Sequence, residues 1–318
     1  MNLFRRIGAP WLAVIVLFTV LGILCQQAGA VQAPAVSQPQ PMQSAPSKKT
    51  QPKTSKKITL VALGDSLTEG IGDQRKQGGY VGQIKTQLTK KADVDATTYN
   101  YGKAGDRSDQ IQARLTKSAT MQNRIKHANV IVMTVGGNDL MQGLQSATIS
   151  GESSVPAMNQ VVKRTQQGYA TKLQSLLTQV RQLNPKAPIF LFGIYNPVYV
   201  YFANITQLNT YIQSFNQTTQ TAAASYKQLY FMNINETLSY GQYNTVKKRS
   251  ALAAKDAAAN ENTTFDGKAI EKSLVSGSTG ELNDYLSPAD HFHPNYSGYT
   301  KMTDILYKTM RQHDGWLS

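Results

Sequence analysis

Five short runs of branched and aromatic side chains constrain the fold of this chain most strongly. They are bounded by turn residues and separated by longer segments with helical spacing. From Tyr169 to Leu183, apolar residues recur at intervals of three and four, and a similar pattern begins near Asn295. Strands that alternate with helices in this way form a parallel sheet with helices on both faces. We therefore predict an α/β fold, a three-layer α/β/α sandwich. The predicted strands are residues 58–63, 96–99, 130–135, 188–192 and 229–233.

Four short polar blocks occur along the chain, and three of them directly follow predicted strands. They read GDSLTEG at 64–70, NYGKAGD at 100–106, VGGND at 135–139 and DHFHP at 290–294. In the first block, Ser66 stands where a buried strand gives way to a turn, and the flanking glycines let the backbone bend there. Free N–H groups at the start of a following helix would receive a developing negative charge. Ser66 therefore suits a nucleophile, although a serine in this place is also a common helix cap.

Together, the four blocks resemble those of the SGNH/GDSL hydrolase superfamily, and the resemblance extends over residues 58–318. It implies the flavodoxin-like SGNH hydrolase fold, with the blocks at the carboxyl ends of the strands. It also implies a catalytic triad of Ser66, Asp290 and His293. The oxyanion hole would consist of the backbone N–H groups of Ser66 and Gly105 and the side-chain amide of Asn138. The member that the chain resembles is an exported lipase or acylhydrolase of Gram-positive bacteria.

The residue types in these blocks fit acyl transfer. A serine hydroxyl is a weak nucleophile at neutral pH, so a neighbouring base has to take its proton. Histidine suits this task because its unperturbed pKa of about 6.5 lies close to working pH. An acid on the other ring nitrogen fixes the tautomer, and the spacing of Asp290 and His293 lets one short loop supply both. We assign structural roles to Asp65 and Asp139, which we expect to bond the backbone of their turns.

The expected function is that of an exported serine esterase or lipase that hydrolyses carboxylic esters through an acyl-enzyme on Ser66. The motifs determine the chemistry at the carbonyl group and do not specify the leaving group, so lipids, thioesters and acetylated sugars all stay open as substrates. One alternative is a carbohydrate O-deacetylase that acts on cell-wall or extracellular polysaccharide. Another is a catalytically silent surface-binding protein on the same fold. We expect the domain to be a monomer.

No cofactor and no metal are implied. His291 and His293 could form half of a metal site, since imidazoles two apart on a strand share a face. However, the chain has four histidines and one cysteine, so the remaining ligands would have to be carboxylates. We therefore reject the metal site.

The N-terminal 30 residues are typical of a targeting segment. Two arginines precede an apolar run at 11–24, and a small-x-small cleavage signal ends at Ala30. The run is long for a signal peptide and short for a spanning helix, so cleavage after Ala30 and retention as a membrane anchor are both open. Residues 31–57, rich in Pro, Gln, Ser and Lys, are predicted to be a disordered linker to a hydrolase domain at 58–318. The domain would be extracellular, either secreted or tethered to the outer face of the membrane.

Charge and cysteine content agree with such a placement. Of the net charge of +14, seven positive charges precede residue 58, where no acidic residue occurs, so the rest of the chain carries +7. The basic residues of that part are scattered without a nucleic-acid motif, which argues against nucleic acid as a partner. Association with anionic lipid or wall polymers is one explanation, and a merely solvated basic surface is another. With Cys25 as the only cysteine, no intramolecular disulfide can form.

Two further segments could shape substrate choice. Residues 195–215 contain six aromatic side chains, which could line an acyl or leaving-group pocket but which we expect to pack the following helix. Residues 236–286 are long, polar and rich in Gly, Ser and Asn, and could form a lid or rim over the site. Within them, the pattern predicts a short helix over 246–258.

Overall fold

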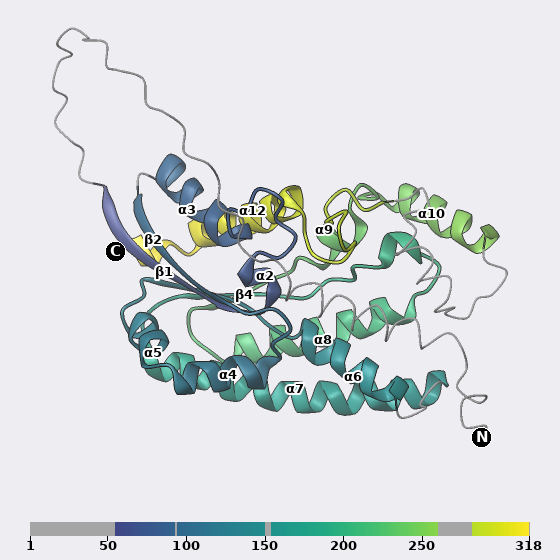
Figure 1. Ribbon diagram of the computed structural model, residues 1–318, viewed down its shortest axis with the longest axis horizontal. Coiled ribbons are helices and arrows are strands. Elements are labelled where there is room, and N and C mark those ends of the chain that lie inside the picture. Colours follow the sequence, from purple (N-terminus) through teal and green to yellow (C-terminus); the bar gives the residue numbers. More distant parts are fainter. Residues whose placement is uncertain (1–54, 93, 150–153, 260–281, 318) are drawn as a thin grey trace, which may run out of the picture.

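The structure is a computed structural model, and it describes residues 55–92, 94–149, 154–259 and 282–317 (Figure 1). The predicted targeting segment and all but the last three residues of the predicted linker lie outside the described residues. So does the middle of the predicted lid, at 260–281. Within the described ranges, no helix has both the length and the apolar character that crossing a bilayer requires.

The described strands form one parallel sheet in the order β2-β1-β3-β4-β5. This is the strand order of flavodoxin-like folds. The strands are β1 (Lys56–Gly64), β2 (Val94–Gly102), β3 (Val130–Thr134), β4 (Ile189–Phe192) and β5 (Leu229–Met232). All five predicted strands are confirmed. The edge strand β2 is longer than predicted, because its alternating exposed and polar positions conceal its ends in the sequence.

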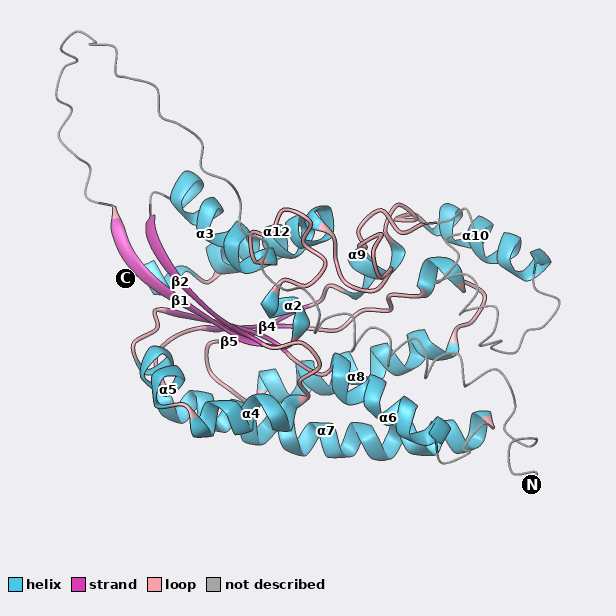
Figure 2. Ribbon diagram, in the orientation of Figure 1, coloured by secondary structure: helices cyan, strands magenta, loops and turns pink. Residues whose placement is uncertain are grey.

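Helices cover both faces of the sheet, so the three-layer arrangement is confirmed (Figures 1 and 2). The first face is covered by α3 (Gly79–Ala92), α9 (Asn235–Tyr240) and α12 (Tyr296–Gln312). The second is covered by α4 (Ser108–Lys117), α5 (Ala119–Lys126), α6 (Gly137–Ile149), α7 (Val155–Leu183) and α8 (Gln207–Ala224). Within the described residues, the remaining helices are α2 (Ser66–Glu69), α10 (Val246–Ala259) and the 3-10 turns Tyr199–Tyr201 and Asp314–Leu317. The predicted helix over 246–258 corresponds to α10.

The central strands are buried on both faces, which explains their continuous apolar sequences. In β3, Val130 and Val132 belong to the core beneath α3 and α12. Ile131 and Met133 belong to the core beneath α4 and α7. Successive side chains of a strand point to opposite faces, so each layer of helices receives every second residue.

The ends of three strands lie level with one another, and this positions the site. Gly64 at the end of β1 pairs with Gly102 of β2 on one side and with Thr134 of β3 on the other. A Cβ at Gly64 would lie 2.3 Å from the Thr134 hydroxyl, so only glycine allows this close approach. The loops after β1, β2 and β3 therefore leave the sheet together at its carboxyl edge, where open α/β sheets bind their ligands.

Candidate active site

Ser66 is the first residue of α2 and lies two residues after the end of β1. Its neighbour Asp65 caps this helix: the carboxylate accepts hydrogen bonds from the Leu67 N–H at 3.0 Å and from the Thr134 hydroxyl at 2.7 Å. Burial raises the pKa of Asp65, against the lowering effect of these hydrogen bonds. Asp65 thus bonds the backbone of its turn, as predicted, and fixes the start of α2 on which Ser66 stands.

One chain of hydrogen bonds links the three residues of the predicted triad. Ser66 Oγ lies 3.0 Å from His293 Nε2, and His293 Nδ1 lies 2.8 Å from Asp290 Oδ2. Ser66 and His293 are 8% and 6% exposed. If the neutral imidazole donates from Nδ1 to the carboxylate, its Nε2 is left to accept the serine proton. The arrangement is one in which a histidine can activate a serine.

Asp290 is fixed by the loop that carries it. Its Oδ1 accepts the N–H groups of Phe292 at 2.9 Å and His293 at 3.0 Å. Burial alone would raise the pKa of Asp290, but the hydrogen bond and charge of His293, with these backbone donors, hold that pKa below its ordinary value. Asp290 is therefore ionised at neutral pH.

The loop is closed at its base. Ser287 N–H donates to His293 O at 2.8 Å, and Leu286 and Pro294 form an antiparallel bridge. Asn295 caps α12 by accepting the Gly298 N–H at 2.9 Å, and its amide donates to Leu286 O at 2.9 Å. We call residues 287–294, which run from the residue after Leu286 to its bridge partner Pro294, the histidine loop.

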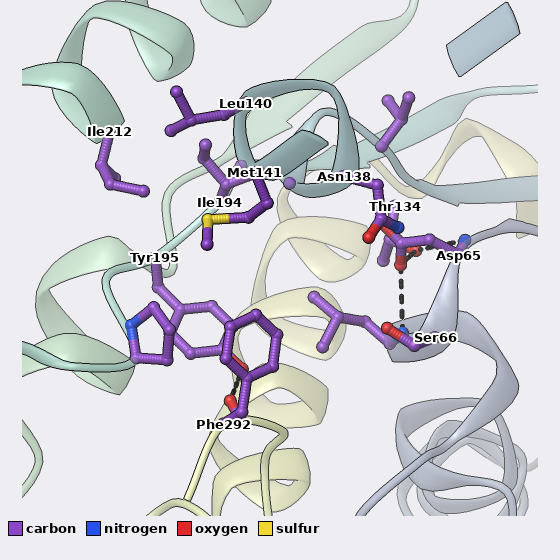
Figure 3. Close-up of a pocket in the computed structure, with 15 residues that line it drawn as sticks. Asp65, Ser66, Thr134, Asn138, Leu140, Met141, Ile194, Tyr195, Ile212 and Phe292 are labelled. Carbon is purple, nitrogen blue, oxygen red and sulfur yellow. Dashed lines mark hydrogen bonds between the residues drawn. The ribbon is translucent and has the colours of Figure 1, made fainter. Parts of the chain in front are cut away.

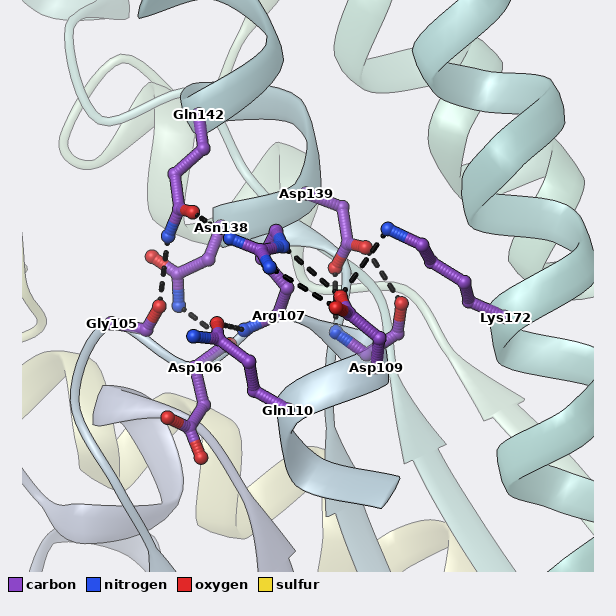
Figure 4. A network of polar contacts seen from close by, with 10 residues as sticks. Gly105, Asp106, Arg107, Asp109, Gln110, Asn138, Asp139, Gln142 and Lys172 are labelled. Atoms are coloured by element: carbon purple, nitrogen blue, oxygen red, sulfur yellow. Dashed lines mark hydrogen bonds and ion pairs between the residues drawn. The ribbon is translucent and has the colours of Figure 1, made fainter. Parts of the chain in front are cut away.

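Gly105 lies on a loop that two side chains hold in place. Its φ of +82° suits glycine, and a Cβ there would meet nothing within 4 Å, so the backbone angle alone favours glycine. The Glu69 carboxylate accepts the N–H of the preceding Ala104 at 2.5 Å. The Gln142 amide donates to Gly105 O at 2.9 Å (Figure 4). No described residue accepts the N–H groups of Ser66 or Gly105, so both are available to a ligand.

Asn138 is the second residue of α6 and lies half-buried beside the same loop. Its Nδ2 donates to Asp106 O at 3.0 Å, which uses one of the two protons on that nitrogen (Figure 4). The next residue, Asp139, accepts the Ser108 N–H at 2.9 Å and the Ser108 hydroxyl at 2.6 Å. Burial raises the pKa of Asp139 against the effect of these bonds. Asp139 therefore joins α6 to α4, which agrees with the structural role predicted for it.

A small apolar cavity of about 50 Å³ lies beside Ser66 (Figure 3). Its walls come from the start of α2, the junction of β3 and α6, the segment after β4, α8 and the histidine loop. The apolar residues that line it are Leu67, Val135, Leu140, Met141, Ile194, Tyr195, Pro197, Ile212 and Phe292. In the view of Figure 3, the side chains of Met141 and Tyr195 lie between Leu140 of α6 and Phe292 of the histidine loop.

The expectation that the aromatic residues of 195–215 pack the following helix holds for Tyr211 and Phe215, which belong to α8, and does not describe the other four. Phe215 and Tyr211 are buried beneath the helices of the second face. Tyr199 packs in a small cluster with Leu252 of α10, and Tyr201 and Phe202 form another small cluster. Tyr195 is buried too, but its ring also lines the cavity. Three residues before Tyr195, β4 ends at the carboxyl edge of the sheet, and that position was the available sequence signal.

No metal centre is evident in the described part of the chain, because no group of three or more His, Cys, Asp or Glu side chains there could hold an ion. His291 contacts a residue outside the triad, since its Nδ1 lies 3.3 Å from the Tyr201 hydroxyl.

The chain is similar to known proteins in sequence and in fold. The model of the GDSL-like lipase/acylhydrolase family matches residues 62–301. The chain belongs to this family. The resemblance to SGNH/GDSL hydrolases predicted from the four blocks is therefore confirmed.

The chain is also similar to two relatives and to one solved structure. The uncharacterized protein YpmR of Bacillus subtilis (strain 168) is 24% identical over 261 residues, which are 82% of this chain and 84% of YpmR. The spore germination lipase LipC of Bacillus licheniformis is 27% identical over 160 residues, 50% of this chain and 72% of LipC. The crystal structure of the lipase Lip_vut3 from a goat rumen metagenome has a TM-score of 0.56 and 20% identity, and the match covers 79% of this chain and 96% of that one. That last likeness concerns the fold alone.

Proposed function

We propose that this family member cleaves carboxylic esters through an acyl-enzyme on Ser66. The observation that carries the proposal is the unbroken hydrogen-bond chain from the Ser66 hydroxyl through His293 to Asp290, with the apolar cavity beside it. Membership in a family of lipases and acylhydrolases supports the same reaction class. A catalytically silent protein would be expected to lack one of these groups, and here all three are present.

The proposed reaction follows from the positions of these groups. His293 Nε2 takes the hydroxyl proton while Ser66 Oγ attacks the ester carbon, and Asp290 stabilises the imidazolium. The N–H groups of Ser66 and Gly105 and the second amide proton of Asn138 bind the oxyanion. His293 then gives its proton to the leaving alcohol. Water, activated by the same imidazole, releases the acid and restores the serine.

The cavity beside Ser66 favours a short acyl group. One water molecule needs about 10–15 Å³ of such volume, so a cavity of about 50 Å³ holds a few non-hydrogen atoms. Acetyl to butyryl groups match this size, and their apolar chains match the lining. We therefore propose short-chain esters as the substrate class. The same observation favours the second candidate, an O-deacetylase of cell-wall or extracellular polysaccharide, because acetyl is the smallest of these groups.

Active-site labelling tests the nucleophile. We expect a fluorophosphonate to form one adduct on Ser66 of the full-length chain, as read by mass spectrometry. Ser66→Ala should remove the adduct and lower the hydrolysis of 4-nitrophenyl acetate by about a thousandfold or more. Ser225→Ala changes an exposed serine at the end of α8 and should match the wild type. Full esterase activity in Ser66→Ala would overturn the proposed mechanism.

We also propose that the protein is exported and acts outside the cell. The arginines, apolar run and small-x-small signal of the first 30 residues support this placement. Fractionation of cells that produce the full-length chain would test it, with immunodetection of the culture medium and the membrane. Retention in the cytosol would contradict it.

A further inference from the structure

The histidine loop is held from outside by hydroxyl groups of the segment that joins β4 to α8. The Tyr195 hydroxyl donates to Phe292 O at 2.6 Å (Figure 3). The Tyr201 hydroxyl lies 3.3 Å from His291 Nδ1, one residue earlier in the loop. Of the two contacts, the first is shorter and falls on the residue directly before His293.

The Tyr195 contact acts on the peptide unit that carries the histidine. Phe292 O and His293 N belong to one planar peptide group. Tyr195 holds its carbonyl, and Asp290 Oδ1 accepts its N–H at 3.0 Å. Because both polar ends of this plane are fixed, its rotation is restricted, and so is the direction in which the His293 side chain leaves the backbone. A small rotation would move Nε2 away from the Ser66 hydroxyl.

The surroundings make this a strong contact. Tyr195 is 7% exposed, and a hydrogen bond in such a place has little competition from water. Burial, followed by the negative charges of Asp290 and Asp65, raises the pKa of Tyr195 well above its ordinary value. The hydroxyl therefore stays protonated and remains a donor throughout the pH range in which an esterase works.

The same two residues also line the cavity. The rings of Tyr195 and Phe292 form part of its wall, and the Phe292 ring meets the His293 ring edge-on at 5.1 Å between centroids. An acyl group in the cavity would press against the side chains that orient the base. Tyr195 and Phe292 would therefore contact the substrate, and the hydrogen bond between them also fixes the backbone beside His293.

We propose that Tyr195 is a positioning residue, which holds the Phe292–His293 peptide so that His293 Nε2 stays in line with the Ser66 hydroxyl. This inference rests on the proposed function, because it gives His293 the role of base. Tyr195 touches neither the serine nor the proton in transit, and it acts through the backbone of the loop.

Tyr195→Phe tests the proposal by deleting one oxygen atom and keeping the ring in the cavity wall. In the full-length chain, we expect kcat for 4-nitrophenyl butyrate to fall about tenfold while KM changes less than about twofold, because the hydrogen bond orients the base and the ring still binds the acyl group. The rate of fluorophosphonate labelling of Ser66 should fall by a similar factor.

Tyr211→Phe is the matched control. Tyr211 is also 7% exposed, and its hydroxyl also donates at 2.6 Å, but to the Asn159 side chain of α7. It should retain wild-type kcat and labelling. A further readout separates positioning from general loosening: the far-downfield proton signal of the His293 Nδ1–H bonded to Asp290 should shift or broaden in Tyr195→Phe and stay unchanged in Tyr211→Phe.

The outcomes separate the two proposals. If wild-type Ser66 is labelled but Tyr195→Phe keeps the wild-type kcat, labelling rate and downfield signal, the positioning role is wrong and the proposed function stands. If both tyrosine variants lose activity equally, the effect is general to buried tyrosines and the positioning role is also wrong. If the wild type is not labelled at Ser66, the proposed function itself fails.

Discussion

The two aspartates that precede Ser66 and His293 in the sequence show how the surroundings of a carboxyl group determine its role. Asp65 and Asp290 are both largely buried, yet the pKa of Asp65 is raised and that of Asp290 is lowered. Burial is the largest influence on each. Asp290 differs because a histidine and two backbone N–H groups bond its carboxylate. Of these two aspartates, Asp290 is therefore the one whose surroundings favour the negative charge that the proposed mechanism requires.

Asp290→Asn should lower kcat by about a thousandfold or more, since the amide cannot hold the imidazole in the same tautomer. It should also lower stability at neutral pH. A carboxyl whose pKa is depressed by folding stabilises the folded state above its unfolded pKa, and this contribution is lost as pH falls through the folded pKa. Urea unfolding at pH 7 and near pH 3 measures both limits. The gap in unfolding free energy between wild type and variant should narrow in acid, and a constant gap would contradict the assignment.

At the scale of elements, α6 is the helix that brings most of the site together. Its first turn carries Asn138, and the next turn carries Met141 towards the cavity and Gln142 towards Gly105. A neighbouring network connects Arg107 with Gln142 and with Asp109, which also meets Lys172 of α7 at 3.3 Å (Figure 4). The position of α6 therefore affects both the acyl cavity and the loop that carries an oxyanion donor.

Met141→Ala should widen the cavity and shift selectivity towards longer acyl chains. Each additional buried methylene contributes about 0.8 kcal/mol, so room for about two more methylenes should raise the ratio of kcat/KM for hexanoyl over acetyl esters about tenfold. A series of 4-nitrophenyl esters measures this ratio. Met121→Ala, which shortens a buried methionine of α5 outside the cavity lining, should leave the ratio unchanged. An unchanged ratio in Met141→Ala would show that the acyl group binds elsewhere.

Elements were easier to predict than the walls of the site. β3 and β4 are buried on both faces, so their sequences are continuously apolar and stand out. Ser66 and His293 could be predicted as site residues because each belongs to a short block that is recognisable as a motif, GDSLTEG at 64–70 and DHFHP at 290–294. Ile194 and Ile212 carry no such mark: they are ordinary apolar residues, and only the folding of distant segments onto one edge places them beside Ser66. Tyr195 shares this property, which is why the sequence left a pocket-lining role open for it but favoured packing.

At the scale of the whole molecule, the last helix closes the first face of the sheet. Tyr299, Met302, Leu306 and Met310 of α12 are buried in the core with Tyr80 and Ile84 of α3. The helix begins immediately after the histidine loop, with Asn295 as its cap. The core under α12 and the geometry of His293 thus depend on the same element.

Leu306→Ala should lower the unfolding free energy of the domain by about 2–5 kcal/mol, because Leu306 is 0% exposed and alanine leaves a cavity. Urea denaturation measures the change. Lys308→Ala removes an exposed side chain of the same helix and should have little effect. Since α12 carries the base of the histidine loop, esterase activity should be lost over the same urea range as the fold. Activity that survives the unfolding of α12 would contradict this dependence.

The direction of β1 has a practical consequence. The strand enters the sheet at Lys56, whose ammonium group contacts Leu317 O, and runs nine residues to Gly64 beside the site. At about 3.3 Å per residue, its two ends lie roughly 26 Å apart. A solid support attached directly at the start of β1, without the predicted linker between them, would join the domain at the end of the strand opposite the edge that carries Ser66. Immobilised in this way, the enzyme would present Ser66 to the surrounding solution and away from the surface that holds it.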